Sequence, residues 1–319
     1  MQILVTGGAG YIGSVVCEML LDNGHSMVVI DDLRDGNAAA ISPGTVFFEK
    51  NFSDADTLHH IFSSYSIELV IHLAALANVP DSVVNPLNYY ENNMNGTVVL
   101  LQKMKEFNIQ RIIFSSTAAV YGDPVFSPMT EAHPREPVNP YGFSKLFDEQ
   151  VIKDCCVAHG LQYFIFRYFC AAGATKLHGE SRTHESHLIP LAIDTALGKR
   201  ESLAVFGNDF DTADGSGVRD FIHVADIANA HILAMQSNQW NQVLNLGTGS
   251  GYSVLEIIKE TEKVTGKPIN YSIAPKRPGD PPSLIASPAT AKELIGWEPQ
   301  HSLYNIISSA VAWRQHPLY

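Results

Sequence analysis

The chain has 319 residues, 45% of them hydrophobic, which is enough to bury a large core as one α/β unit or two domains. The formal net charge is −12 and there is no basic run to neutralise phosphates, which argues against a nucleic-acid partner. Four cysteines, two of them adjacent at Cys155 and Cys156, form neither a secreted disulfide framework nor a pair of CxxC zinc motifs.

The N-terminal sequence MQILVTGGAG lacks the basic start, apolar core and small-residue cleavage site of a signal peptide. No apolar run in the chain approaches the ~18 residues that a membrane-spanning helix needs. We therefore expect a soluble, cytoplasmic protein that has no membrane partner.

Short β-rich runs alternate with helical stretches along the chain. Most of these runs are continuously apolar, which is typical of parallel strands covered on both faces. Between the first two runs, Val16, Met19 and Leu20 recur at helical spacing before Gly24, which predicts a helix over 13–25. The alternation predicts an α/β fold with a Rossmann-type doubly wound parallel sheet. The expected strands are 2–7, 26–31, 45–51, 68–75, 111–116, 163–169 and 243–247.

The pattern changes after about Phe169. Loops rich in glycine, histidine and aspartate follow, and helical spacing returns near 224–237 and 254–266. We place a domain change here, between a first domain over 1–169 and a smaller C-terminal α/β domain over 170–319, with some later segments returning to the first domain.

The first expected strand leads directly into TGGAGYIG, which places Gly7, Gly10 and Gly13 at a spacing of three. Such a turn can be purely steric, because a tight strand-to-helix connection needs glycine. Here it opens a helix, and Asp31 ends the second strand roughly 20 residues further on. The helix N-terminus suits a pyrophosphate, and the carboxylate suits a ribose 2′-hydroxyl but repels a 2′-phosphate. The constellation therefore predicts NAD rather than NADP.

In the stretch NPYGFSKLFDEQ, Tyr141 and Lys145 stand four residues apart and share one face of an expected helix. An ammonium, together with the positive nicotinamide ring, favours a phenolate and brings the pKa of a tyrosine towards the working pH. Such a tyrosine can act as a general base. Ser115, Ser116 and Thr117 end an expected strand, where sheets of this kind bind ligands. A surface Tyr-Lys pair beside an unrelated serine-rich turn is the alternative, and the glycine turn favours the catalytic interpretation.

Several motifs together resemble a known family: TGGAGYIG, SSTAAVYGD, PYGFSK, RYF, FGNDFDTADGSGVRDFIHV, NLGTG and APKRPGDPP. The chain resembles the extended short-chain dehydrogenase/reductase superfamily, and within it most closely the UDP-glucose 4-epimerases, over nearly its whole length. The resemblance implies an NAD-binding Rossmann domain, a UDP-sugar-binding domain and a homodimer formed through helices that flank Tyr141 and Lys145.

The resemblance also implies a reaction without net redox change. Tyr141 would take the proton of the sugar 4-hydroxyl while tightly held NAD accepts hydride from C4, and the 4-keto sugar would then turn over and be reduced on its other face. Lys145 would hold the nicotinamide ribose and lower the pKa of Tyr141, and Thr117 would hold the sugar O4. Arg219 and Arg277 would clamp the pyrophosphate.

The remaining site residues follow from the same resemblance. The cofactor contacts it implies are Gly7, Gly10, Tyr11, Ile12, Gly13, Asp31, Leu73, Ala74, Ala75, Asn93, Ser115, Tyr141, Lys145 and Phe169. The substrate contacts it implies are Thr117, Cys170, His187, Leu188, Ala204, Phe206, Arg219, Arg277, Asp280 (to the uridine ribose) and Leu284.

Three positions depart from the family pattern. Cys170 stands where these epimerases usually have an asparagine that contacts the substrate, so one polar contact is weakened. Ala77 replaces a lysine found near the cofactor in some members, which predicts looser retention of NAD. Leu284 occupies the position beside the sugar C2 substituent, and its size predicts a preference for UDP-glucose and UDP-galactose over their N-acetylated forms.

Other readings of the sequence stay open. A 4-epimerase of UDP-N-acetylglucosamine, UDP-glucuronate or a UDP-pentose is one alternative. A sugar-nucleotide dehydratase typically has an Asp-Glu pair after the threonine, whereas Thr117 precedes two alanines. A non-catalytic NAD-binding regulator has no need for Thr117, Tyr141 and Lys145 together. A metal site could use His178, His184 and His187, but their spacing matches no compact zinc motif, and we expect no metal.

Overall fold

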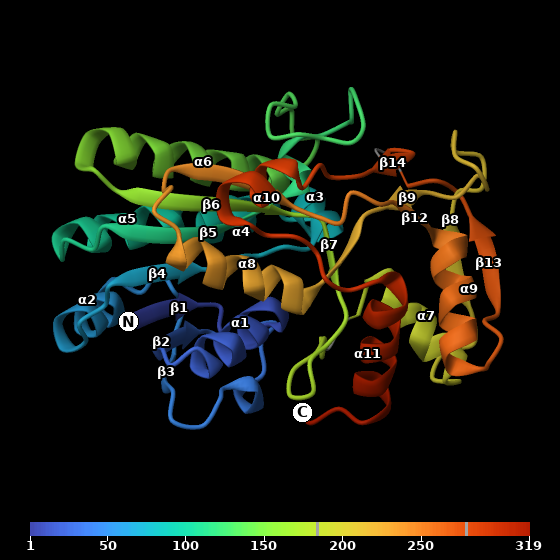
Figure 1. Cartoon of the computed structure of the whole chain (residues 1–319), viewed down its shortest axis with the longest axis horizontal. Coiled ribbons are helices and arrows are strands. Elements are labelled where there is room, and N and C mark those ends of the chain that lie inside the picture. The colour runs from blue at the N-terminus through green and yellow to red at the C-terminus, as the bar shows by residue number, and fades with distance from the viewer. Residues whose placement is uncertain (183–184, 278–279) are drawn as a thin grey trace. The chain divides into compact units, whose positions relative to one another are not determined.

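The computed structural model describes residues 1–182, 185–277 and 280–319, and the chain divides into two compact units (Figure 1). Both units are built from separate stretches of the chain. Unit 1 consists of Met1–Gly122, Pro134–Tyr168 and Ala228–Leu244, and unit 2 consists of Asp123–His133, Phe169–Ile227 and Asn245–Tyr319. Among the described residues, none of the helices combines the length and the apolar character that a membrane crossing requires.

A seven-stranded sheet with the strand order β11-β6-β5-β4-β1-β2-β3 forms the centre of unit 1. The five strand pairings from β3 to β6 are all parallel, which confirms the predicted fold class. The order reverses direction between β1 and β4, and such a switch point creates a crevice at the carboxyl ends of the strands. The strands are β1 (Gln2–Thr6), β2 (Ser26–Asp31), β3 (Val46–Glu49), β4 (Leu69–His72), β5 (Arg111–Thr117), β6 (Gln162–Tyr168) and β11 (Gln242–Leu246).

Apolar residues of both parities along these strands are buried, because helices cover both faces of the sheet (Figure 1). Leu4, Val28 and Ile165 belong to the core shared with α2, α5 and α6. Phe166 points to the opposite face, where its ring meets His231 of α8 at 5.1 Å between centroids. The helices of this unit are α1 (Tyr11–Asp22), α2 (Ala55–Ser64), α3 (Val79–Val84), α4 (Pro86–Tyr89), a π-helix (Tyr90–Asn95), α5 (Gly96–Glu106), α6 (Pro140–His159) and most of α8 (Val224–Gln236), with 3-10 turns at Ala38–Ala40 and Ala118–Val120.

The described strands of unit 2 form three small sheets rather than one large one, in the orders β10-β7, β12-β9-β14 and β13-β8. Helices α7, α9 and α11 pack against one another around Ile193, Ile257 and Ile306, which are fully buried. Its elements are β7 (Cys170–Ala172), α7 (Leu188–Ala196), β8 (Leu203–Phe206), β9 (Val218–Arg219), β10 (Phe221–His223), β12 (Tyr252–Ser253), α9 (Val254–Thr265), β13 (Tyr271–Ala274), β14 (Ser283–Leu284), α10 (Ala289–Ile295) and α11 (Leu303–Gln315).

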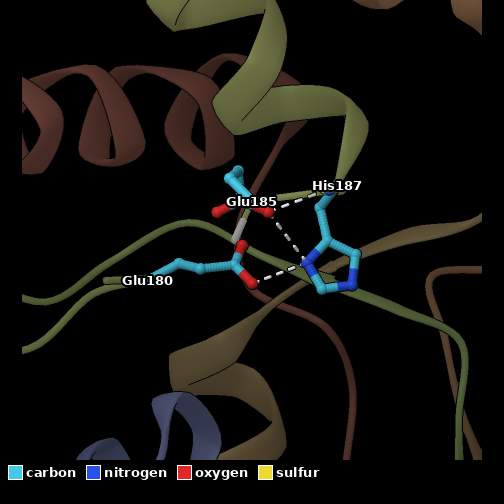
Figure 2. Close-up of side chains that lie close together, drawn as sticks. All are labelled: Glu180, Glu185 and His187. Carbon is cyan, nitrogen blue, oxygen red and sulfur yellow. Dashed lines mark hydrogen bonds and ion pairs between the residues drawn. The ribbon is translucent and has the colours of Figure 1, made fainter. Parts of the chain in front are cut away.

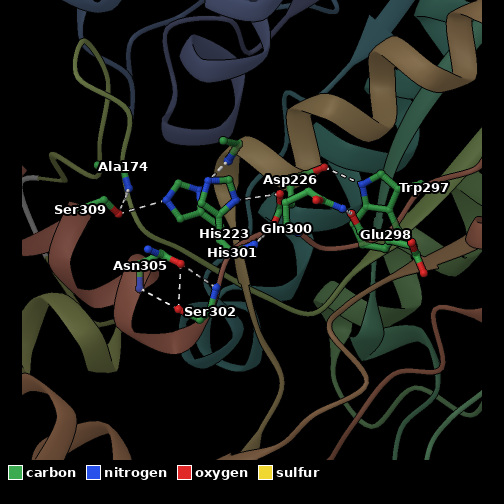
Figure 3. A network of polar contacts seen from close by, with 11 residues as sticks. Ala174, His223, Asp226, Trp297, Glu298, Gln300, His301, Ser302, Asn305 and Ser309 are labelled. Carbon is green, nitrogen blue, oxygen red and sulfur yellow. Dashed lines mark hydrogen bonds and ion pairs between the residues drawn. The ribbon is translucent and has the colours of Figure 1, made fainter.

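A polar network fastens α11 within unit 2 (Figure 3). The ring of His301 stacks on that of His223 at 4.0 Å, and Asp226 binds His301 Nδ1 at 2.8 Å. His223 Nδ1 accepts the Ala225 N–H, so its Nε2–H is free to donate to Ser309 of α11 at 3.0 Å. Burial, with the nearby His301, lowers the pKa of His223 to about 3, and this ring is therefore a neutral structural contact.

Candidate functional site

The glycine turn between β1 and α1 is a tight backbone cradle in unit 1. Gly7 has φ +74°, and a Cβ there would lie 2.6 Å from the Ala74 nitrogen, while a Cβ on Gly13 would lie 2.0 Å from the Gly7 carbonyl oxygen. Gly10 is the N-cap of α1, and no side chain caps this helix or adds an acid to its first turn, which begins with Tyr11 and Ile12. The positive end of α1 is therefore available to an anion.

Asp31 ends β2 beside this turn. Its two carboxylate oxygens accept the N–H groups of Ala9 at 3.0 Å and Leu33 at 2.8 Å, which fixes their direction. Burial raises the pKa of Asp31, and these two N–H donors oppose that rise. Each oxygen keeps a lone pair for a further donor, such as a ribose hydroxyl.

The segment Leu73–Ala75 follows β4 and lies against the end of β1, where the Leu73 N–H donates to the Thr6 carbonyl at 3.1 Å. Asn93, in the π-helix, holds the next residue, because its Oδ1 accepts the Leu76 N–H at 2.9 Å and its Nδ2 donates to the Leu76 carbonyl at 3.0 Å. The same amide donates to Ser144 of α6 at 3.0 Å. Asn93 therefore joins the loop after β4 to the helix that carries Tyr141 and Lys145.

The helix α6 begins where local sequence rules place it. Asn139 is the N-cap and accepts the Gly142 N–H at 2.8 Å, and Pro140 is the first helical residue. A Cβ on Gly142 would lie 2.5 Å from the Ala119 carbonyl oxygen. Only glycine lets α6 come this close to the turn that follows Thr117. This contact places Tyr141 on the helix end nearest the end of β5.

Thr117 is the last residue of β5 and caps the 3-10 turn after it, since its hydroxyl oxygen accepts the Ala119 N–H at 3.1 Å. The hydroxyl proton remains available to a ligand oxygen. Ser115 points to the face of the sheet where Tyr168 of β6 lies. Burial, together with nearby Tyr141, raises the pKa of Tyr168, and the Ser115 hydroxyl opposes that rise by favouring the ionised phenol. The described end of β5 therefore carries hydroxyls beside a tyrosine.

Lys145 is almost completely buried, with its Nζ 4.5 Å from the centroid of the Phe114 ring. Burial lowers the pKa of Lys145, while the nearby Asp148 and Glu149 carboxyls act in the opposite direction. Glu149 forms an ion pair with Arg167 of β6, whose Nη2 lies 2.6 Å from Oε2. The sequence interpretation missed Asp148 and Glu149, although their spacing of three and four residues after Lys145 places all three on one helical face.

In unit 2 the two arginines expected to clamp a pyrophosphate meet around one carboxylate. Arg219 Nη2 and Arg277 Nε lie 3.7 Å and 3.4 Å from the two oxygens of Asp280. Arg219 is further fixed by donating to the Val218 and Pro281 carbonyls at 2.8 Å and 3.0 Å. The Arg277 guanidinium lies 4.4 Å from the Phe206 ring centroid. An acidic chain here concentrates two cations at one place, a suitable arrangement for a dianion.

The expected substrate positions Leu284, Ala204, Phe206 and Cys170 and the expected cofactor position Phe169 also lie in unit 2. Leu284 on β14 pairs with Arg219 on β9, and Ala204 shares the exposed face of β8 with Phe206. The Phe169 N–H donates to the Leu246 carbonyl at 3.1 Å, and the Cys170 N–H to the Asp220 carbonyl at 2.9 Å. Burial raises the pKa of the Cys170 thiol to about 11, opposed by Arg219 and aided by Asp220, so the thiol is protonated and unreactive at neutral pH.

His187 precedes Leu188 at the start of α7 and lies between two glutamates (Figure 2). Its Nδ1 is 2.6 Å from Glu180 Oε1 and 3.3 Å from Glu185 Oε1. Burial disfavours the charged ring, but the two carboxylates outweigh it and raise the pKa of His187 to about 9. The ring is therefore an imidazolium at neutral pH, with its Nδ1–H directed at the two carboxylates.

The histidine trio considered for a metal does not form one group in the described part of the chain. The group whose ligand atoms lie within 4.8 Å of one another is Glu180, Glu185 and His187. His178 is buried elsewhere, with Nδ1 3.2 Å from the Tyr319 hydroxyl, and His184 lies outside the described residues. Sequence spacing did not indicate Glu180, which lies seven residues before His187, and Glu185, two residues before it, was overlooked.

Comparison with known proteins identifies the chain's relatives. A sequence profile of the NAD dependent epimerase/dehydratase family matches residues 3–247. A UDP-glucose 4-epimerase of Halalkalibacterium halodurans is 48% identical over 324 residues, which cover 99% of this chain and 97% of that protein. The identity extends through both units, so the resemblance inferred from the motifs is confirmed over the whole chain.

Solved structures give the same result. The UDP-glucose 4-epimerase from Bifidobacterium longum in complex with NAD+ and UDP matches with a TM-score of 0.95 and 38% identity, covering 99% of each chain. The UDP-Glc/GlcNAc 4-epimerase from Campylobacter jejuni matches with a TM-score of 0.87 and 38% identity, covering 98% of this chain and 99% of that one.

The charged His187 generates a prediction about stability and pH. Its folded-state pKa of about 9 lies above the ordinary value of 6.5, so its ion pairs stabilise the fold fully below pH 6.5 and stop doing so as the pH rises through 9. The side chain is half exposed, so solvent screening limits this contribution to about 0.5–1 kcal/mol. In urea titrations, His187→Gln should therefore be less stable than wild type at pH 6 and equal to it at pH 10. His60→Gln, on the exposed side of α2, is the control, and a His187 difference that does not change with pH would contradict the charge assignment.

Proposed function

The chain belongs to the NAD dependent epimerase/dehydratase family. We propose that the polar residues described in unit 1 and those described in unit 2 perform different steps of one reaction. The enzyme uses NAD to epimerise a UDP-hexose at C4 through a 4-keto sugar, as its UDP-glucose 4-epimerase relatives indicate. In this proposal unit 1 binds NAD and carries the proton-transfer residues, and unit 2 binds the UDP moiety.

The residues of unit 1 fit a dinucleotide. The backbone cradle at Gly7 and Gly13 leaves no room for side chains, and the uncapped start of α1 suits a pyrophosphate. Asp31 has the free lone pairs that a ribose diol needs. Leu73–Ala75 lie against the end of β1, and Asn93 links the residue that follows them to α6. When bound, NAD supplies the hydride acceptor at C4 and returns the hydride to the keto sugar.

The proton step is assigned to Tyr141, with Lys145 and Thr117 as its partners. The single observation that carries this assignment is the contact of Gly142 with Ala119, which holds the start of α6 against the 3-10 turn that directly follows Thr117. Lys145, one helical turn after Tyr141, favours the ionised phenol by its charge and is held in place by burial. Thr117 keeps a hydroxyl proton for the sugar O4. Tyr141 removes the proton from the 4-hydroxyl and returns it when the ketone is reduced.

Substrate anchoring is assigned to unit 2. Arg219 and Arg277 provide the positive charge for the pyrophosphate. Asp280, which lies near both arginines, accepts a hydrogen bond from a uridine ribose hydroxyl in this proposal. His187, Leu188, Ala204 and Phe206 complete the proposed UDP site, and Cys170 contributes a protonated thiol in place of a stronger polar group.

Tyr141→Phe tests the proton-transfer assignment. The variant keeps the ring and its packing but removes the proton acceptor, so kcat for UDP-galactose should fall by about 10²–10⁴-fold while UDP affinity stays within a few fold. Tyr304→Phe makes the same change at an exposed position of α11 and should leave kcat unchanged. Turnover of Tyr141→Phe near the wild-type rate would remove Tyr141 from the mechanism.

Leu284 is proposed to limit the sugar that can turn over. It is large, lacks a hydrogen-bond donor for an N-acetyl carbonyl, and pairs with Arg219, one of the proposed phosphate ligands. We expect wild type to prefer UDP-galactose over UDP-N-acetylgalactosamine, and Leu284→Ser to reduce that preference by about 10-fold, which is the usual effect of pocket size. The readout is the ratio of kcat/KM for the two sugars, in which losses common to both cancel. Equal wild-type use of both sugars would reject Leu284 as the limit.

A homodimer is proposed through α3, α4 and α6. Exposed apolar side chains gather on these helices, which pack against one another: Val83, Val84, Leu87, Phe143 and Phe147. Phe147→Asp places a charge in this patch and should convert a dimer to a monomer in light scattering after gel filtration. Val157→Asp, on the same helix but outside the patch as defined, should stay dimeric, and a dimeric Phe147→Asp would contradict the assignment.

A further inference from the structure

Asp148 is a buried carboxyl group for which the reaction described above has no use. It is fully buried on α6, three residues after Lys145, and neither of its oxygens has a hydrogen-bond partner among the described residues. A carboxyl group without such partners is costly to bury, so its persistence needs a compensating interaction. The Lys145 ammonium on the same helical face is the charge that can supply it.

The other charged groups around Lys145 are already neutralised. Glu149 receives Nε and Nη2 of Arg167 at 2.8 Å and 2.6 Å, together with the Ser116 hydroxyl at 2.6 Å. Lys153 adds a further contact to Glu149 at 3.4 Å. These partners leave Glu149 with its charge balanced by cations other than Lys145.

Neighbouring elements provide no other anion among the described residues. From β4, His72 contacts the hydroxyls of Thr6 at 2.7 Å and Thr97 at 3.2 Å, and burial together with Lys145 holds its pKa well below the usual value, so it is neutral. Thr97 of α5 and Phe114 of β5 carry no charge. Asp148 is therefore the carboxyl that balances Lys145.

We propose that Asp148 is a positioning residue, the counter-ion that keeps Lys145 protonated in its buried place and thereby sets the pH range of catalysis. Burial raises the pKa of Asp148 and lowers that of Lys145, and each charge opposes the shift of the other. The proposal rests on the roles of Tyr141 and Lys145 in the proposed function.

Removing the carboxylate changes the charge of the site by one unit without removing a group that touches a ligand. Every proton near Lys145 then dissociates at lower pH, because a negative charge that favoured its retention is gone. The ammonium is lost at lower pH, and while it remains it favours the Tyr141 phenolate more strongly. Both limbs of the pH profile of kcat should therefore move in the same direction.

The test is Asp148→Asn in the full-length enzyme with NAD bound, assayed with saturating UDP-galactose from pH 5.5 to 10. We expect both limbs of the kcat profile to shift to lower pH by about one unit, with KM changed less than threefold. Asp154→Asn makes the same change at an exposed position of α6 and should reproduce the wild-type profile. A uniform loss of kcat with unmoved limbs would overturn the proposal, because a purely structural role predicts that result.

A second measurement needs no activity. Lys145→Met leaves Asp148 buried without its cation, so the pKa of this carboxyl rises further and the variant should lose stability relative to wild type as the pH rises from 5 to 9. Lys145→Met/Asp148→Asn should lose that pH dependence. A Lys145→Met stability that follows wild type across this range would overturn the proposal. Wild-type protein that lacks epimerase activity would instead reject the proposed function and leave this stability test intact.

Discussion

The contact of Gly142 with the Ala119 carbonyl is the constraint on which the arrangement of unit 1 depends. It brings the start of α6 closer to the turn after β5 than any side chain would permit. The proposed catalytic tyrosine and lysine lie on α6, and the threonine is the last residue of β5, immediately before that turn. Asn139 and Pro140 fix where α6 starts, so the approach of the helix also fixes which of its faces carries Tyr141 and Lys145. The local residues that start α6 therefore also determine where the proposed catalytic side chains lie.

That face of α6 continues inward as a set of buried charges. Lys145 is followed by Asp148 and Glu149, and Glu149 in turn reaches Arg167 on the neighbouring strand. Removing one partner of a buried ion pair destabilises the fold, because the remaining charge keeps its full desolvation cost. The position of the lysine is therefore determined by the charge balance of the core beneath it as well as by the ligand it is proposed to meet.

The sequence predicted some of these features better than others, for physical reasons. Strand runs such as Ile112–Phe114 are apolar at successive positions, so both-sided burial and the parallel sheet could be inferred directly. The helix expected over 13–25 begins earlier, at Tyr11, and ends at Asp22, because helix ends depend on capping geometry that periodicity does not encode. Arg219 and Arg277 were named through family motifs, yet their meeting at Asp280 depends on a long-range strand pairing. Glu180 was missed because it lies seven residues before His187, a spacing that matches no compact metal motif, and Glu185 was missed although it lies only two residues before that histidine.

The division of the chain into interrupted segments has a consequence for synthesis on the ribosome. Strand β6 is complete at Tyr168, but the strand that covers its outer edge, β11, is not made until residues 242–246. Throughout the translation of the intervening residues, the nascent sheet presents an unpaired edge of apolar sequence, the kind of surface that pairs with other chains. A fragment that stops at the end of β6 keeps this edge permanently. The last strand of the sheet therefore closes this edge, and the chain must be translated past the unit 2 stretch Phe169–Ile227 and on to Leu246 before the sheet of unit 1 is complete.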